Sequence, residues 1–204
     1  MDEDYDQASE NPYYALYPKI PNAWLYIVID IRDLTMSKIG LTTNEHPMNR
    51  ISQGKTYNPF LMLFATYELS KCTFGISLKE LQDIEGYLHG RSTFGGAIKH
   101  LQSGRESEWF YTHPEEAEYQ VDIHLAKRGF SVDGKTLYTV YEGYQQHGDI
   151  VIERMRKIKT IIRPNPEEFY LNAVNCGLQP EQFRPYYDYL LEYHSRDAIA
   201  KVYL

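Results

Sequence analysis

The feature that most constrains the fold is an apolar run at residues 24–31. Six consecutive aromatic and aliphatic residues, Trp24-Leu-Tyr-Ile-Val-Ile29, precede its first charged side chain. Such residues favour strands, and a run that is apolar on both faces predicts a buried strand. Arg32-Asp33 is predicted to be a turn, and Met36–Thr42 the returning strand of a hairpin. We therefore expect a core built on this hairpin. The run is too short to cross a bilayer, which takes about 20 residues.

The residues after the hairpin alternate between helical and strand patterns. Asn44 can cap a helix near Pro47–Gly54, and Ser77 opens a capping box three residues before Glu80. The further expected elements are a strand over Phe60–Leu69, a helix from Ser77 to Gly90, a loop over Thr93–Ser107, a short strand at Glu108–Tyr111 and a helix over Pro114–Arg128. This order predicts an α+β fold. We expect a small domain with a three-stranded antiparallel sheet flanked by helices, plus a C-terminal mixed α/β extension.

The chain divides into three expected regions. Residues 1–20 form an acidic N-terminal arm, with one Lys against five Asp and Glu. Residues 21–130 form the α+β domain, and residues 131–204 form a C-terminal accessory region. In that region a strand is expected at Thr136–Tyr144, a strand or a helix at Ile150–Ile162, and helices at Pro166–Asn175 and Pro180–Glu192.

Charge and composition exclude several classes of protein. The chain is 43% hydrophobic and 24% charged, which is ordinary globular composition. Its acidic start is unlike a signal peptide, which is basic and is followed by an apolar segment. Cys72 and Cys176 are too few for a disulfide framework or a four-cysteine zinc site. We therefore expect an intracellular protein, cytoplasmic or in another intracellular compartment, without a membrane partner and not secreted.

The net charge of −7 makes the chain a poor non-specific binder of nucleic acid. Any role on DNA must then rest on local patches. The plainest patch comprises Arg154, Arg156, Lys157, Lys159 and Arg163. A solvated helix face is an equally good explanation of these five cations.

Several residues in the first half of the chain are individually ordinary but jointly informative. They are Tyr26 on the first strand, Lys38-Ile39-Gly40 on the second, Arg50 on the next helix, and Glu85 with His89 one turn apart on another. Together they resemble the GIY-YIG nuclease superfamily over residues 24–128. The first motif is Leu25-Tyr26-Ile27-Val28 and the second is Lys38-Ile39-Gly40, followed in order by Arg50, Tyr57-Asn58-Pro59, Glu85-x-x-x-His89 and Glu108-Trp109-Phe110. Leu25 stands where the family has Gly, and Lys38 where it has Tyr.

The resemblance implies a metal-dependent endonuclease that hydrolyses phosphodiester bonds in DNA, of phage, restriction or mobile-element type. Glu85 would hold one Mg²⁺ or Mn²⁺ ion, since Mg²⁺ is commonly bound by few carboxylates and retained water. The ion would act as a Lewis acid and supply the water that protonates the leaving group. Arg50 would clamp a phosphate oxygen with its planar donor fork. A dimer would cut both strands, whereas a single copy would nick.

The resemblance assigns the remaining catalytic roles to Tyr26, Lys38 and His89. Tyr26 would orient or deprotonate the attacking water, and an ordinary phenol titrates near pH 10. Lys38 would lower that pKa as an ammonium, or accept the proton as an amine. His89 would hydrogen-bond the water or orient Glu85.

Further residues are candidates for substrate contact or for structural roles. His46, Tyr57 and Asn58 are candidates for contact with the nucleic acid backbone, although Asn58-Pro59 equally suits a turn. Glu108 is expected to serve the fold beside two core aromatics, and His113 to be structural.

Two other interpretations remain open. Leu25 in place of Gly and the acidic balance suit a nuclease-like fold that has lost its chemistry and serves as a DNA-binding or protein-interaction module, because fold alone does not set function. Alternatively, the acidic arm of residues 1–10 could mimic nucleic acid or cover the protein's own site. Retention of Tyr26, Arg50, Glu85 and His89 favours an active enzyme.

Overall fold

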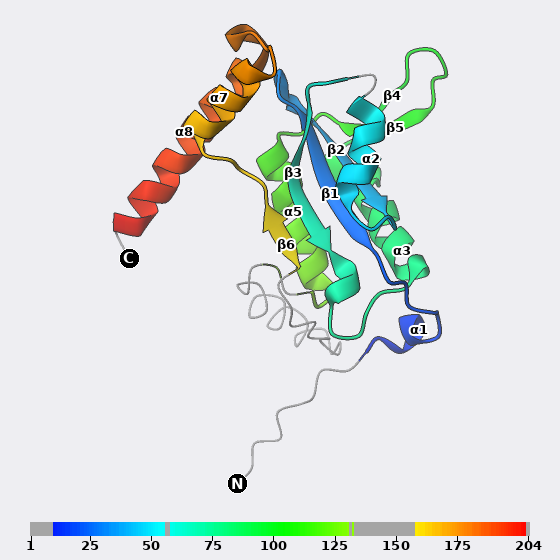
Figure 1. Cartoon of the computed structure of the whole chain (residues 1–204). Coiled ribbons are helices and arrows are strands. Elements are labelled where there is room, and N and C mark those ends of the chain that lie inside the picture. Colours follow the sequence, from blue (N-terminus) through cyan, green and yellow to red (C-terminus); the bar gives the residue numbers. More distant parts are fainter. Residues whose placement is uncertain (1–9, 56–57, 131, 133–157, 203–204) are drawn as a thin grey trace.

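The computed structural model describes residues 10–55, 58–130, 132 and 158–202, and it is an α+β protein. A single antiparallel sheet runs through its centre in the strand order β4-β5-β2-β1-β3-β6 (Figure 1). The strands are β1 Trp24–Asp30, β2 Asp33–Thr42, β3 Leu61–Glu68, β4 Ala97–Lys99, β5 Glu106–Phe110 and β6 Lys159–Ile161. The predicted fold class is confirmed. The predicted number of strands, three, was too low, because the sheet of the described residues has six.

The additional strands are short and lie on the two edges of the sheet. The predicted loop at Thr93–Ser107 contains β4, which pairs with β5. β6 pairs with β3, from Ala65 opposite Ile161 to Tyr67 opposite Lys159. β4 and β6 have three residues each. So short a segment carries too little alternation to be recognised in sequence, and its pairing is set by tertiary contacts.

The helical segments are α1 Pro12–Ala15, α2 Pro47–Lys55, the 3₁₀ turn η1 Leu69–Lys71, α3 Leu78–Leu88, α4 Arg91–Phe94, α5 Pro114–Lys127, α7 Pro166–Asn175 and α8 Pro180–Val202. Of these, α2, α3, α5 and α7 begin and end close to their expected limits, whereas α1, η1 and α4 were not predicted. Ser77 caps α3 by accepting from the Glu80 backbone N–H, as the capping box predicts. His113 caps α5 in the same way, so it has a structural role. α8 continues ten residues beyond the predicted end at Glu192.

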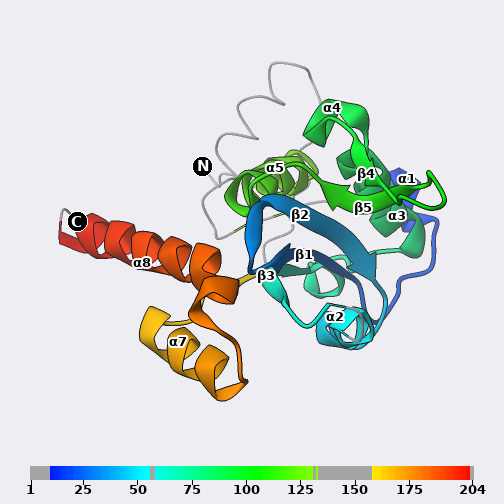
Figure 2. The same cartoon turned by 90° about the horizontal axis from the view of Figure 1, so that it is seen from above.

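Alternation along β1 creates two layers of core. Leu25, Ile27 and Ile29 belong to the main hydrophobic core, together with the buried side chains of α3 and α5. Tyr26 and Val28 point to the other face and pack with buried residues of α2 and β3. Figure 2 shows α2 on one side of the sheet and α3 and α5 on the other. Successive residues of a strand face opposite sides, so β1 supplies both layers.

The C-terminal region is attached to the sheet by buried charges. Lys159 of β6 pairs with Asp122 at 2.6 Å and with Glu118 at 2.7 Å, both on α5. Arg163 also pairs with Glu118, and its Nε donates to the Tyr189 hydroxyl on α8 at 2.7 Å. The hairpin of α7 and α8 extends away from the sheet (Figure 2). Removing one member of such a buried group leaves an uncompensated charge, which is strongly destabilising.

The structure describes the second half of the acidic arm. Of the arm, residues 10–20 are described, and Tyr14 holds them to the body by donating to Asp83 at 3.2 Å and accepting from Arg128. The expected strand at Thr136–Tyr144 lies outside the described residues. Among the helices that are described, none has the length and hydropathy needed to cross a membrane.

We predict that His124 makes the fold sensitive to mild acid. His124 is buried in α5, stacks on Tyr87 at 4.0 Å and accepts from Arg128 Nε at 3.1 Å. Burial and the neighbouring cations lower its pKa to about 3. The unfolded chain, with a histidine pKa of about 6.5, therefore binds the proton first as pH falls, and stability is lost from that pH downward.

Urea denaturation at about pH 7 and about pH 5 should show a loss of about 2 kcal/mol in the free energy of unfolding. His124→Gln should lose clearly less between the two pH values. His100→Gln, at an exposed histidine, should keep the original dependence. An unchanged pH dependence in His124→Gln would contradict the assignment.

Candidate functional site

Tyr26 and Gly40 face each other across the central strand pair, and their contact fixes the position of the phenol. They are register partners of β1 and β2. The Tyr26 ring lies directly over Gly40, so a Cβ added there would come within 2.7 Å of the hydroxyl oxygen and 2.9 Å of Cζ. Real Cβ atoms do not approach so closely. Tyr26 is 1% exposed, so its ring has little room to retreat.

The surroundings of Tyr26 hold its hydroxyl in the protonated form. Burial and the charge of Glu108 raise the pKa of Tyr26 to about 12. Arg50 of α2 opposes this by its charge and by a hydrogen bond from the guanidinium to the phenol oxygen. The Arg50 side chain is otherwise exposed. The strand tyrosine and the helical arginine, both singled out from the sequence, therefore lie side by side.

Lys38 forms an ion pair with Glu108. Its ammonium lies 2.8 Å from the Glu108 carboxylate, across the β2–β5 pair. The pKa of Tyr26 is raised overall, and the largest effect that opposes the rise is the charge of Arg50. The expected effect of Lys38 on Tyr26 stays a prediction. Glu108, which was expected to serve the fold, is held beside the candidate site by this ion pair.

Glu85 and His89 reach the site around the edge of β2. β5 pairs with β2 at Ser37 and Lys38, and the following backbone groups of β2 are used by α3. His89 Nε2 donates to the Ile39 carbonyl at 2.8 Å. The Leu41 backbone N–H interacts with the Glu85 carboxylate. Both functional side chains of α3 are thus positioned by the strand that carries Lys38 and Gly40.

Glu85 is a half-buried carboxylate whose pKa is raised. Burial raises this pKa, and the charge of Glu108 raises it further, while His89, the Leu41 amide and Lys38 oppose the rise. Two carboxylates that share a site resist ionising together. A divalent cation between them would relieve this repulsion.

The donor set suits a hard cation bound mainly by water. Among the described residues there is no cluster of three or more His, Cys, Asp or Glu that could enclose a metal. Glu85, with Glu108 nearby, offers carboxylate oxygens. Mg²⁺ is commonly bound through one or two carboxylates, with water and substrate phosphate completing the shell. The residues therefore fit the expected ion.

Two predicted contact residues have local structural partners. His46 lies before α2, where its Nδ1 accepts from the Met48 backbone N–H at 3.1 Å. Asn58 donates to Asp30 at 2.8 Å and accepts from the Phe60 backbone N–H at 3.1 Å, which holds the turn before β3. His46 is exposed, one turn before Arg50, whereas Asn58 has the turn role that was its alternative.

The side chains of the predicted cationic patch that the structure describes are buried. The side chains of Lys159 and Arg163 are 5% and 3% exposed and are paired with the carboxylates of α5. The prediction that Lys159 binds nucleic acid was therefore wrong, because tertiary packing turns it into the core. Tyr57, Arg154, Arg156 and Lys157 lie outside the described residues.

We predict that Gly40→Ala destabilises the protein by about 1–3 kcal/mol, because the added methyl group overpacks the Tyr26 ring. The free energy of unfolding in urea measures this loss. Gly86→Ala is the matched control, since a Cβ at this α3 position meets nothing within 4 Å. It should leave stability unchanged or raise it by up to about 1 kcal/mol. Equal stability of Gly40→Ala and the original chain would show that the contact is not a constraint.

Comparison with known proteins adds no family to this geometry. No family model, no curated protein and no solved structure matches the chain.

Proposed function

We propose that this chain is a metal-dependent endonuclease that hydrolyses phosphodiester bonds in DNA. One observation carries the proposal. A buried phenol, an exposed guanidinium near it and a half-buried carboxylate of raised pKa lie together around strand β2. Phosphodiester hydrolysis needs groups of these kinds, to orient water, to bind the phosphate and to hold a divalent cation.

Arg50 is suited to bind the phosphate. Its guanidinium is exposed and has no carboxylate partner among the described residues, so its charge is available to a substrate. A guanidinium stays charged at all relevant pH values and offers donors in a planar fork. Because Arg50 is near enough to Tyr26 to affect its pKa, a phosphate held by Arg50 would lie close to the phenol.

Tyr26 is suited to orient the attacking water. With a pKa of about 12 it is a phenol at neutral pH, and the nearby Arg50 guanidinium opposes the rise of that pKa. Its hydroxyl would bind a water molecule beside the phosphate. It can take a proton from that water in proportion to its small phenolate fraction, which grows as pH rises.

Glu85 would hold the ion, and the Lys38–Glu108 pair would set the charge around it. When bound, the ion would polarise a phosphate oxygen and supply a water that protonates the leaving 3′ oxygen. Lys38 neutralises Glu108, which leaves Glu85 as the uncompensated carboxylate. This charge balance suits one ion per site. His89 fixes the end of α3 against β2 and so positions Glu85.

A second candidate function is a catalytically inactive module that binds DNA or a protein. The observation that favours it is the raised pKa of Tyr26, since a phenol protonated at neutral pH is a weak base. The metal carboxylate would then have no use. DNA is the proposed partner of the nuclease and of a DNA-binding module, whereas a protein-binding module would have a protein partner. For each of these functions we propose an intracellular location.

We predict that Glu85→Ala and Arg50→Ala lower the rate of Mg²⁺-dependent cleavage by about a hundredfold or more, because each removes a group that stabilises the transition state. Conversion of supercoiled plasmid in Mg²⁺, in Mn²⁺ and in EDTA measures the rate. Glu116→Ala and Arg184→Ala, at exposed positions on α5 and α8, are matched controls that should cleave normally. Full activity in Glu85→Ala or Arg50→Ala would remove that residue from the site.

We predict that the cleavage rate rises with pH from about pH 6 to about pH 9 without a plateau. The phenolate fraction of Tyr26 grows about tenfold per pH unit below its pKa of about 12. Tyr26→Phe should be slower and should lose most of this dependence. A plateau below pH 8 in the original chain, or an identical profile in Tyr26→Phe, would exclude proton transfer to Tyr26.

A further inference from the structure

The described cations divide into a paired majority and a small group without carboxylate partners. The paired cations are Lys19, Arg32, Lys38, Lys71, Lys79, Lys159, Arg163, Arg184 and Arg196. Within the described part of the chain, no carboxylate pairs with Arg50, Arg91, Lys99, Arg105, Lys127 or Arg128. In a chain with net charge −7, cations left unpaired are the ones available to an anionic partner.

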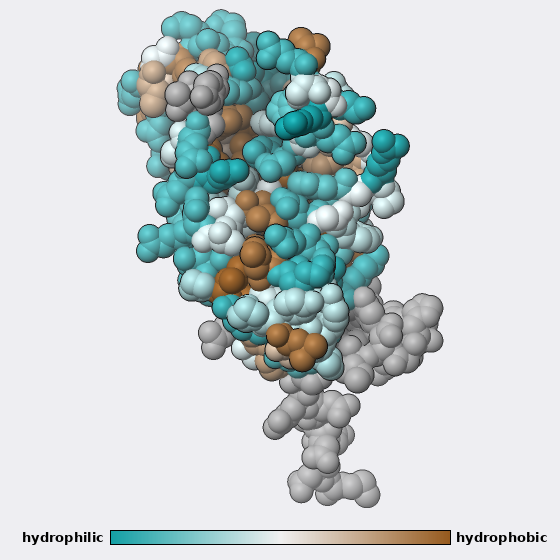
Figure 3. Space-filling model, turned by 90° about the vertical axis from the view of Figure 1, so that its right-hand side faces the viewer, coloured by the Kyte–Doolittle hydropathy of each residue, from teal (hydrophilic) through white to brown (hydrophobic). Residues whose placement is uncertain are grey.

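Three of the unpaired cations lie on one short stretch of the chain. Arg91 begins α4, Lys99 ends β4, and Arg105 precedes β5, and all three are exposed. We call these three residues, with Leu101 at the turn between the two strands, the hairpin strip. The β4–β5 hairpin projects from the body of the molecule in Figure 1. Hydrophilic side chains cover most of the face seen in Figure 3, the side of the molecule on which this hairpin lies.

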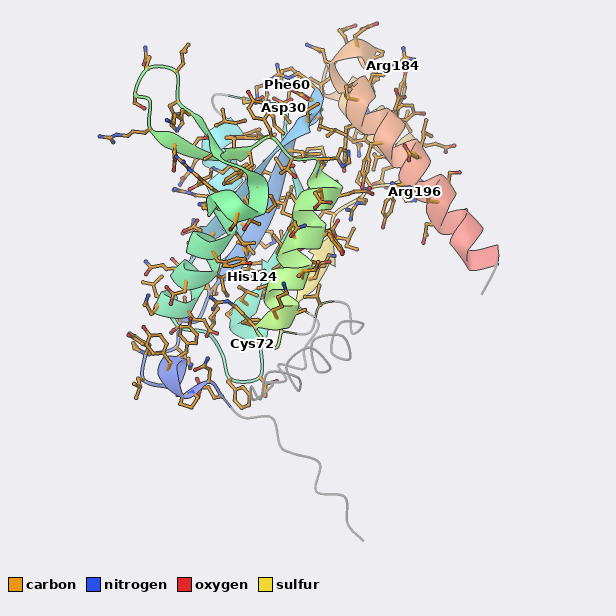
Figure 4. The ribbon with its side chains drawn as sticks, turned by 180° about the vertical axis from the view of Figure 1, so that it is seen from behind. Asp30, Phe60, Cys72, His124, Arg184 and Arg196 are labelled. Atoms are coloured by element: carbon orange, nitrogen blue, oxygen red, sulfur yellow. The ribbon has the colours of Figure 1, made fainter. Side chains whose placement is uncertain are left out.

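The hairpin strip borders the candidate site. α4 begins two residues after His89, and it contacts α3. Lys99 is the register partner of Glu106, and β5 continues from there to Glu108, which binds Lys38. The hairpin is therefore the edge of the sheet nearest to the catalytic candidates. Figure 4, drawn from behind, shows the same hairpin at the end of the molecule opposite to Cys72.

We propose that the hairpin strip binds the phosphate backbone of duplex DNA and holds the duplex across the candidate site. This inference rests on the proposed function and names the surface that receives its substrate. Lys and Arg side chains bind duplex DNA by displacing condensed counterions, which needs cations that are not already neutralised. The strip has three such cations, and Arg50 provides a fourth within the site. It takes the place of the sequence-predicted patch, whose Lys159 and Arg163 are buried.

Leu101 gives the strip an apolar tip that enters a groove. Its side chain is 101% exposed, at the turn between Lys99 and Arg105. Hydrogen bonds close this turn from His100 N–H to the Arg105 carbonyl at 2.9 Å and from Gly104 N–H to the His100 carbonyl at 2.8 Å. Proteins that bind the minor groove use apolar side chains in this way, as wedges against base steps. Leu101, fully exposed at the end of a cationic hairpin, is suited to act as such a wedge.

Glu106 works against the strip. It is exposed, lies opposite Lys99 and has no cation partner among the residues described. Its charge repels the phosphates that Lys99 attracts. Removal of this charge should therefore strengthen binding, whereas removal of the cations should weaken it.

The test measures the affinity for a short fluorescein-labelled DNA duplex of mixed sequence by anisotropy, in EDTA and at several salt concentrations from about 50 to about 200 mM. Arg91→Ala/Lys99→Ala/Arg105→Ala should bind about tenfold more weakly at the lowest salt. Its slope of log affinity against log salt should be smaller by about 2 to 3, since each phosphate contact contributes about 0.9. Leu101→Ala should weaken binding without changing the slope, and Glu106→Gln should strengthen it.

Lys127→Ala is the matched control, because Lys127 is an exposed, unpaired cation near the end of α5. It should bind with the original affinity and slope. Circular dichroism should show that all variants remain folded, since the altered side chains are exposed. A triple variant that binds DNA like the original chain would overturn the inference, as would a loss equalled by Lys127→Ala.

Plasmid cleavage by the same proteins separates this inference from the proposed function. If the original chain binds the duplex through the strip but cuts no DNA in Mg²⁺ or Mn²⁺, DNA binding by the strip is supported and the nuclease proposal is rejected. If the chain cuts DNA and the triple variant binds and cuts equally well, the nuclease proposal is supported and DNA binding by the strip is rejected. An original chain that does not bind the duplex, or whose strip variants lose only affinity for RNA or a protein, would also overturn the inference.

Discussion

The close approach of the Tyr26 ring to Gly40 is the constraint on which the site depends. It requires two strands in a fixed register, a residue without a side chain on one of them, and an aromatic ring on the other. The ring is buried between the sheet and α2, so its hydroxyl is the only part that can act chemically. Its high pKa and its contact with Arg50 both follow from this position. A different residue at position 40 would displace the group around which the others are arranged.

The second organising element is the edge of β2, which three different partners share. β5 takes its first part and brings Glu108 to Lys38, while α3 takes the next part through His89 and Glu85. Side chains from both faces of the sheet therefore meet at the part of β2 that follows its pairing with β5. This explains how α2 and α3, which cover opposite faces, can contribute to one site. It also places the projecting β4–β5 hairpin beside that site, since β5 belongs to both.

Much of this arrangement could be predicted from local patterns, and the remainder depends on long-range packing. The run at 24–31, the capping box at Ser77 and the helical spacing after it give strong local signals, and the elements they predict are confirmed. Tyr26, Arg50, Glu85 and His89 were chosen by their order and spacing, and the fold brings them together. β4 and β6 were missed because three residues carry no usable period. Lys159 and Arg163 were assigned to a surface because a cation is usually exposed, and only tertiary structure shows Glu118 beside them. The ion pair between Lys38 and Glu108 was not predicted, because the two residues lie on strands that are seventy residues apart in the sequence.

If the residues around β2 hydrolyse DNA as proposed, the ends of the product will show which phosphorus–oxygen bond was broken. Supercoiled plasmid would be incubated with the protein in Mg²⁺, and the nicked or linear product would then be treated with DNA ligase. A leaving 3′ oxygen that is protonated, with water attacking the phosphorus, gives a 3′ hydroxyl and a 5′ phosphate. We expect the ligase to reseal the product, and we expect no product in EDTA. No conversion of the plasmid in Mg²⁺ or Mn²⁺, or ends that the ligase cannot join, would exclude the proposed hydrolysis.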